Sequence, residues 1–310
     1  MTMTSKPWRI IPVVTAWTLT GALSAAEMGP PDGPPPITVT ARSRYIGESE
    51  LSHTDTKVSW VSGGIGTEVP FPIVGALNGS VGLSVDYFSA DFKNFESFIP
   101  KTAAPIKHGY EVRFDPGLHY HYSDEWDFFG SVLWQADTAD GASLGRSSMW
   151  GGAAGAAYQV SSNLNVGFGF AAATRLGYAT GYAPFVGVEW RFAPKWHLSL
   201  TGDKTEYVSP VVRVSYQLNE NWSLYTLGGY ETRYIRLDRD SSIPDGTLRY
   251  RAGSFQVGAV YKASKWLTVT GFTGAQIGQD YKFQTSERGL AGKHKAGVAP
   301  TVGLRLNASF

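Results

Sequence analysis

The residues best equipped for chemistry share one side of a short alternating segment. Between Tyr110 and Tyr122 every second residue is mostly apolar or aromatic, and ionisable side chains fill most of the positions between them. A period of two is typical of a β-strand, whose successive side chains point to opposite faces. One face of this predicted strand can therefore pair charges or attract a charged solute. Its ionisable residues are Glu111, Arg113, Asp115, His119 and His121.

Three later segments place ionisable residues in the same way, on the face opposite an apolar one. These residues could pair with one another to neutralise charge away from water, or they could form a selective lining for a small polar solute. Both interpretations stay open. The residues are Glu189, Arg191, His197 and Arg213.

Other reactive arrangements are poorly represented in the sequence. His119 and His121 could bind a metal together, but no third ligand is evident, so we predict no metal site and no cofactor. The absence of Cys removes thiolate chemistry and disulfides. No motif links a Ser to a His, so we predict no catalytic residue and no enzyme. A membrane-embedded lipid hydrolase or acyltransferase remains an alternative.

Composition restricts the kind of fold and partner. Charged residues make up 17% of the chain, aromatics 14%, and Gly accounts for 36 of 310 residues, whereas globular proteins average roughly 25% charged residues and ~7% Gly. This profile favours β-structure rich in turns. The net charge is +1 and the basic residues are scattered, so we expect no nucleic-acid partner.

The N-terminal region predicts export. Lys6 and Arg9 precede an apolar run that ends at the small residues Ser24, Ala25 and Ala26. The run is shorter than the ~20 residues that a spanning helix needs, so residues 1–26 are predicted to be a cleavable signal peptide. The proline-rich stretch after it predicts a periplasmic tail or linker over residues 27–50, followed by the main domain at 51–310.

The main domain reads as strands that end in aromatic residues. Short polar turns recur with a Trp or Tyr on one or both sides, as an interfacial girdle requires, because an indole or phenol ring keeps its body in lipid and its polar atom at the headgroups. Longer polar stretches separate the other strand ends. Short turns at one end and long loops at the other predict an all-β, transmembrane, antiparallel up-and-down β-barrel. The predicted girdle comprises Tyr122, Trp126, Tyr158, Trp190, Trp196, Tyr216, Trp222, Tyr261 and Trp266.

The last segment is apolar in one phase and ends on an aromatic residue. Leu304, Leu306 and Phe310 share this phase. The segment resembles the C-terminal strand of outer-membrane proteins, which the barrel-assembly machinery reads, although Ala308 stands where an aromatic is common. The resemblance implies that this machinery is a partner during biogenesis. It also implies contact with outer-membrane lipids and a location in the bacterial outer membrane.

The expected barrel has about 12 strands, within a range of 10 to 14, because each crossing needs about 9 to 11 residues. A hairpin formed by residues 37–45 and 54–61 would raise the number to fourteen. Residues 184–200 and 212–230 also resemble an uncharacterised family of bacterial outer-membrane barrels of about this length. We expect a monomeric, porin-like channel or passive transporter for small solutes. The alternative is a non-conducting structural or surface-binding barrel.

Overall fold

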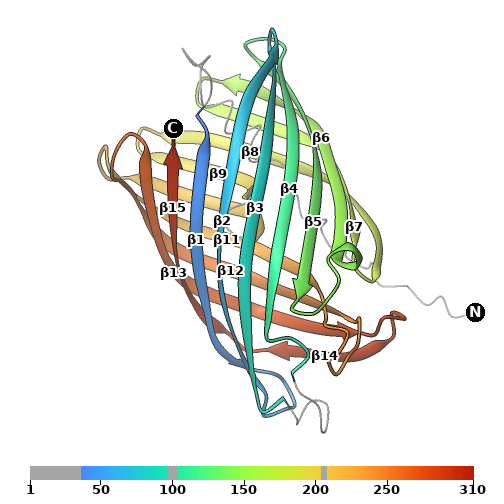
Figure 1. Cartoon of the computed structure of the whole chain (residues 1–310). Coiled ribbons are helices and arrows are strands. Elements are labelled where there is room, and N and C mark those ends of the chain that lie inside the picture. The colour runs from blue at the N-terminus through green and yellow to red at the C-terminus, as the bar shows by residue number, and fades with distance from the viewer. Residues whose placement is uncertain (1–35, 96–103, 204–207) are drawn as a thin grey trace, which may run out of the picture.

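The computed structural model describes residues 36–95, 104–203 and 208–310, which form a closed antiparallel β-barrel (Figure 1). One short 3-10 helix, η2 (Gly145–Ser147), follows β5. No helix among the described residues is long and apolar enough to span a membrane. The strands are β1 (Thr38–Glu50), β2 (Lys57–Val74), β3 (Leu77–Lys93), β4 (His108–His121), β5 (Trp126–Ala139), β6 (Ser148–Ser161), β7 (Leu164–Arg175), β8 (Tyr178–Ala193), β9 (Trp196–Asp203), β10 (Val208–Gln217), β11 (Trp222–Arg236), β12 (Thr247–Lys262), β13 (Leu267–Gln284), β14 (Leu290–Ala296) and β15 (Ala299–Ser309).

The barrel closes because its first and last strands pair. β1 lies antiparallel to β15 from Thr38↔Ser309 to Ile46↔Thr301, and β15 also pairs with β13. β14 pairs with the far end of β13, over Gln279–Gln284, and so continues the line of β15. The wall therefore has 14 strands. The expectation of about 12 is corrected to the upper end of its range, and no free edge remains where the ends of the sheet meet.

The additional strands are β1 and β2, so the barrel begins at Thr38. The predicted boundary at residues 50 and 51 is wrong, because residues 38–50 form a barrel strand and not a linker. The prediction failed because Ala41 and Ser43 leave the outward phase of β1 weakly apolar, and glycines dilute the pattern of β2. The predicted signal peptide lies outside the described residues.

Five short polar turns with a neighbouring Trp or Tyr join adjacent strands at one end of the barrel, which we call the short-turn end. They connect β4 to β5, β6 to β7, β8 to β9, β10 to β11 and β12 to β13. Phe310 lies at this end, where it exchanges two backbone hydrogen bonds with Ile37. In outer-membrane barrels short turns face the periplasm and longer loops face outward. This rule orients the barrel in the membrane.

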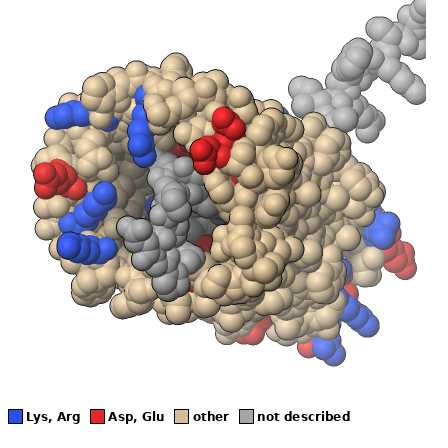
Figure 2. All heavy atoms as spheres, turned by 90° about the horizontal axis from the view of Figure 1, so that it is seen from above, with Lys and Arg blue, Asp and Glu red and all other residues tan. Residues whose placement is uncertain are grey.

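The outside of the barrel is apolar between its two ends. Residues such as Ile65, Phe170, Val186 and Val302 point outward and are about half exposed. Figure 2 shows that charged side chains gather towards the two ends, whereas the visible wall between them is largely free of them. Such a surface is suited to lipid and not to water.

The opposite end, which we call the loop end, is much narrower. Five strands, β6–β10, separate β5 from β11 along the sheet, yet Thr138 of β5 and Arg236 of β11 form a bridge. Arg236 also donates hydrogen bonds to the backbone oxygens of Arg146 and Asp245. Nine strands therefore surround the loop end, while all fourteen surround the short-turn end. Because the number of surrounding strands differs between the two ends, we describe the interior as a loop-end half and a short-turn half.

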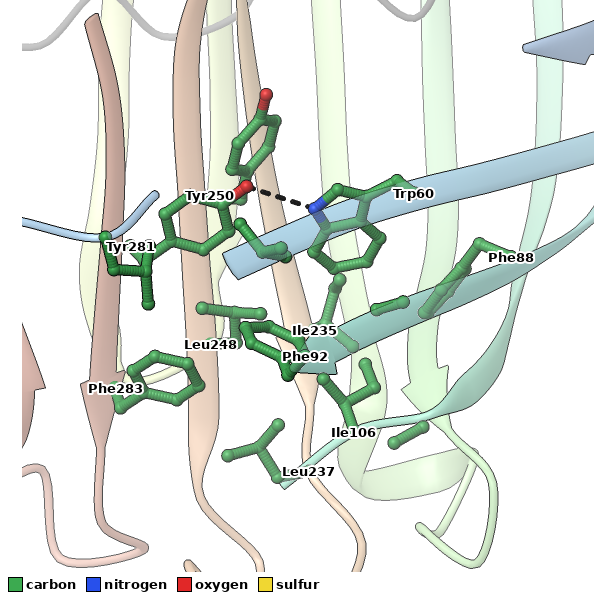
Figure 3. Close-up of a cluster of buried hydrophobic side chains, with 14 of the residues drawn as sticks. Trp60, Phe88, Phe92, Ile106, Ile235, Leu237, Leu248, Tyr250, Tyr281 and Phe283 are labelled. Carbon is green, nitrogen blue, oxygen red and sulfur yellow. Dashed lines mark hydrogen bonds between the residues drawn. The ribbon is translucent and has the colours of Figure 1, made fainter. Parts of the chain in front are cut away.

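A hydrophobic core fills the loop-end half (Figure 3). Trp60 of β2 donates a hydrogen bond from its indole to the Tyr281 hydroxyl of β13, at 3.1 Å. Its ring also packs against Phe88, Phe92 and Tyr250. Since β2, β3, β12 and β13 all contribute inward-facing side chains to one cluster, the core joins opposite parts of the wall and occludes this half.

Candidate functional site in the barrel interior

The charged residues predicted from the β4 sequence do point into the barrel. Glu111, Arg113 and Asp115 are buried on the inner face of β4. Arg113 donates a hydrogen bond to Glu111 at 2.6 Å. Glu111 also receives a contact from Arg233 of β11 at 3.3 Å. The arrangement is mutual neutralisation, the first of the two interpretations left open by the sequence.

This contact belongs to a larger network between the two halves of the interior. Arg44 of β1 makes a two-pronged ion pair with Glu231 of β11, with both N–O distances at 2.8 Å. Arg42 pairs with Asp86, and Arg233 contacts Asp137 at 3.3 Å. The four arginines and four carboxylates are Arg42, Arg44, Arg113, Arg233, Asp86, Glu111, Asp137 and Glu231, and all are buried.

The network draws β11 across the lumen. Through Glu231 and Arg233, this strand contacts β1, β4 and β5, and the Arg233 guanidinium lies 4.6 Å above the Phe88 ring of β3. Removing one partner of a buried ion pair leaves an uncompensated charge, which is strongly destabilising. The network and the hydrophobic core together therefore hold the loop-end half closed.

Sequence reasoning missed most of this network. Arg42 and Arg44 fell inside the predicted linker, although their spacing of two residues was a strand signal. Glu231 and Arg233 lie on the inner phase of a predicted strand, so alternation alone could have identified them as inward-facing. Asp137 fell in a stretch that was predicted to be a loop, whereas the structure extends β5 to Ala139. Their pairing across the lumen could not be read from the sequence, because it depends on how far β11 leans towards β4.

The short-turn half has a different inner surface. Phe129, Ala153, Ala157, Ala171 and Phe185 form a buried apolar cluster on β5–β8, with Ala173 and Ala183 packed against it. We call these seven residues the apolar inner wall. Seen from the short-turn end, the barrel is hollowed (Figure 2).

Glycines make this wall smooth. The Phe129 ring lies against Gly155 of β6, and the Phe185 ring lies against Gly169 of β7, at positions where an added Cβ would overlap the ring. The two rings stack with centroids 6.1 Å apart. Each aromatic ring therefore occupies the space that a side chain at the neighbouring glycine would fill. No side chain in the apolar inner wall carries a hydrogen-bonding group.

Among the residues that the structure describes, the backbone ladder is interrupted beside this surface. β9 pairs with β8 only over Val188–Ala193, and β10 pairs with β11 only as far as Gly229. Among the described residues, 178–187 of β8 and 230–235 of β11 therefore have no ladder partner on their facing sides. Pro184 lies in the unpaired part of β8, a position suited to a residue without a backbone donor. Phe185 of the apolar inner wall lies in the same stretch.

The contact between Tyr178 and Tyr234, with ring centroids 5.4 Å apart, bounds this interruption towards the loop end. The interruption therefore lies between the tyrosine contact and the short β9–β10 hairpin. We call it the β8–β11 gap.

The remaining predicted polar residues lie towards the short-turn end. His119 and His121 both approach Asp127 of β5, at 3.3 and 2.9 Å. No group of three or more potential metal ligands occurs among the residues that the structure describes. The Arg213 guanidinium lies 4.3 Å above the Tyr225 ring, and Arg191 is exposed near the rim.

Glu189 links two further polar residues of β9. It contacts His197 at 2.7 Å and accepts a hydrogen bond from Ser199 at 2.6 Å. In a catalytic triad the imidazole lies between the hydroxyl and the carboxylate, so that it can take the hydroxyl proton. Here the carboxylate lies between the other two groups. The contact therefore does not activate Ser199 as a nucleophile.

The predicted girdle residues lie outward at the short-turn end and contact one another between strands. Trp126 packs on Tyr158, Trp196 on Tyr216 and Trp222 on Tyr261, with ring centroids 4.8, 4.8 and 4.6 Å apart. The remaining girdle residues, Tyr122, Trp190 and Trp266, are also exposed. Their arrangement matches a membrane-interface girdle.

The C-terminal residues lie on the outside of the barrel. Leu304 and Leu306 face outward, Phe310 is exposed, and the Trp266 ring stacks on the Phe310 ring. Whether the assembly machinery reads them stays a prediction.

A closed antiparallel barrel with an apolar exterior and short turns at one end is an outer-membrane β-barrel. The protein is therefore located in the bacterial outer membrane. A family model matches residues 144–306, and the chain belongs to that family, which is described as Domain of unknown function (DUF6268). None of the curated proteins matches the chain significantly.

Solved structures show the same fold. An outer membrane channel from Pseudomonas putida F1 aligns with a TM-score of 0.50 at 11% identity, covering 91% of this chain and all (100%) of that chain. A FadL homologue from Pseudomonas aeruginosa aligns with a TM-score of 0.50 at 12% identity, covering 94% and 93%. At these identities the similarity establishes the barrel fold alone.

Proposed function

We propose that this protein is a passive outer-membrane channel for small, largely apolar molecules. The apolar inner wall carries the proposal. Water-filled barrels have polar interiors, whereas this wall is built of Ala and Phe side chains beside glycines, with Ser131 of β5 opposite Ala153. A polar molecule would lose its hydrogen bonds to water there without replacement, which disfavours its binding.

The route would connect the apolar inner wall with the β8–β11 gap. Phe185 belongs to both, so an apolar molecule could move between the interior and the lipid along the β8 side of the gap, whereas Glu231 and Arg233 of the charge network lie on its β11 side. The closed loop-end half supports a path through the side of the barrel over a straight aqueous pore. The two structural neighbours, a channel and a FadL homologue by name, are compatible with this activity.

A second candidate is a non-conducting structural barrel. The core and charge network that fill the loop-end half favour it, because they leave no straight passage among the described residues. The two candidates differ in what a bulky residue on the inner wall would do. It would block a channel, but it would not affect a role that depends only on the outer surface.

The test uses the hydrophobic fluorophore N-phenyl-1-naphthylamine, which an intact outer membrane largely excludes. Host cells with the barrel should take it up faster than cells without it, while hydrolysis of the polar probe nitrocefin in their periplasm should not accelerate. Ala153→Phe, on the inner wall, should abolish the gain. Ala154→Phe makes the same change on the exposed outer face of β6 and should preserve it.

Folding of each variant is checked by its heat-dependent shift on electrophoresis. Unchanged fluorophore uptake on expression of the folded wild-type barrel would refute the channel and favour the structural candidate. Equal uptake by the two folded variants would refute the inner-wall route.

A further inference from the structure

Two rows of charged residues cross the outer face of the barrel at the loop end. Arg249 of β12, Lys282 of β13 and Lys293 of β14 are directly opposite one another in neighbouring strands. The adjacent row consists of Arg251, Asp280 and Lys295. We call the five cationic residues of these rows the basic patch. Figure 1 shows the three strands side by side at this end.

These side chains face outward because the residues between them face inward. Tyr250, Tyr281 and Phe283 belong to the hydrophobic core, and side chains alternate along a strand. Gly278, with a φ of +62°, takes the left-handed conformation. It lies where the register shifts between β12 and β13. The irregularity keeps both Ile277 and Asp280 on the outer face.

Asp280 compensates only part of the charge. It accepts hydrogen bonds from Arg249 at 2.9 Å and from Arg251 at 2.7 Å. It is the one acidic residue of β12, β13 and β14 among the described residues. The first row is wholly cationic, although like charges directly opposite each other destabilise a sheet. The patch therefore has an excess of positive charge that an external anion would neutralise.

The patch begins where the apolar exterior ends. Along β12 the outward residues change from Phe255, which is 49% exposed, to Arg251. On β13, Ile277 is followed towards the loop end by Asp280 and Lys282. Along the line of β15 and β14, in the same direction, Val298 is followed by Lys295. The transition occurs on all three strands, at the level expected for the headgroups of the outer leaflet.

An aromatic residue at the start of β8 completes the patch. The Tyr178 ring lies 5.4 Å from the Arg249 guanidinium and 5.1 Å from the Lys282 ammonium. Cation–π contacts of this kind hold long basic side chains in place. They orient Arg249 and Lys282 along the outer face of the barrel.

We propose that the basic patch binds the phosphate groups of lipopolysaccharide, the phosphorylated glycolipid of the outer leaflet. Outward orientation, position at the headgroup level and excess charge all point to an anionic lipid beside the wall. The lysines supply mobile point charges, and the arginines present a fixed hydrogen-bonding surface. This inference does not depend on the transport function.

The test measures binding of purified lipopolysaccharide to the full, refolded barrel in detergent by microscale thermophoresis. Wild type should bind it at least about tenfold more tightly than enzymatically dephosphorylated lipopolysaccharide, since each cation near an anionic surface contributes substantially. The variant K282Q/K293Q/K295Q should lose that preference. The matched control K195Q/K262Q/K265Q removes the same charge from the short-turn end and should retain it.

Equal affinity of wild type for the two glycolipid forms would overturn the proposal, as would equal loss in both triple variants. Millimolar inorganic phosphate is the competitor. If it displaced the glycolipid from wild type, the patch would be a general anion site and the assignment to lipid would be wrong. Retained binding in its presence supports the assignment.

Discussion

Replacing Glu231 with Gln should weaken the barrel far more than removing a carboxylate from its surface. The Glu231 side chain is 1% exposed and holds Arg44, which is 3% exposed, through two contacts of 2.8 Å. Breaking a buried pair by removing one charge typically costs about 3–5 kcal/mol. Because Gln retains one acceptor, we expect a loss near the lower limit, about 3 kcal/mol.

The assay is equilibrium unfolding by guanidinium in lipid vesicles, followed by tryptophan fluorescence. Glu48→Gln is the control, because Glu48 pairs with Lys93 at an exposed position and exposed pairs contribute little. The double variant Arg44→Leu/Glu231→Leu should be more stable than Glu231→Leu alone, since it leaves no single buried charge. A Glu231→Gln variant as stable as the Glu48→Gln control would refute the argument that the network holds the loop-end half closed.

Two further predictions concern the walls and the core. Gly169→Ala should destabilise the barrel by about 1–3 kcal/mol, because the new methyl group would meet the Ala154 backbone oxygen and the Phe185 ring. The control is Gly228→Ala, where nothing lies within 4 Å of an added Cβ. This variant should be as stable as wild type in the same unfolding assay. Phe283→Ala should cost about 3–5 kcal/mol, since this ring is fully buried in the core; a midpoint of unfolding equal to that of wild type would show that the core is not packed as described.

The sequence predicted the wall better than the interior. Alternation, aromatic turns and the final aromatic residue suffice to identify a barrel, because lipid imposes an apolar outward phase on nearly every strand. The sequence offered β1 only as part of an optional hairpin, because Ala41 and Ser43 make its outward phase weakly apolar. Its inward Arg42 and Arg44 are the partners of Asp86 and Glu231.

The apolar inner wall was not predicted for a related reason. In β6 the inward residues Ala153 and Ala157 alternate with outward Ala154 and Tyr158, so the sequence shows two apolar faces. Such a strand does not reveal which face is inside until its neighbours fix the register. The charged phase of β4 suggested a polar lumen, but its Glu111 and Arg113 neutralise each other in the closed half.

The most direct test of the account is ion conductance of the refolded barrel in a planar bilayer, with insertion confirmed independently. A barrel that conveys apolar molecules along its inner wall and is closed at the loop end should show no steady conductance. Arg213→Glu, which reverses a charge on the inner face of the short-turn half, should leave it silent. A stable conductance whose ion selectivity changed with this reversal would contradict the account and identify an aqueous channel.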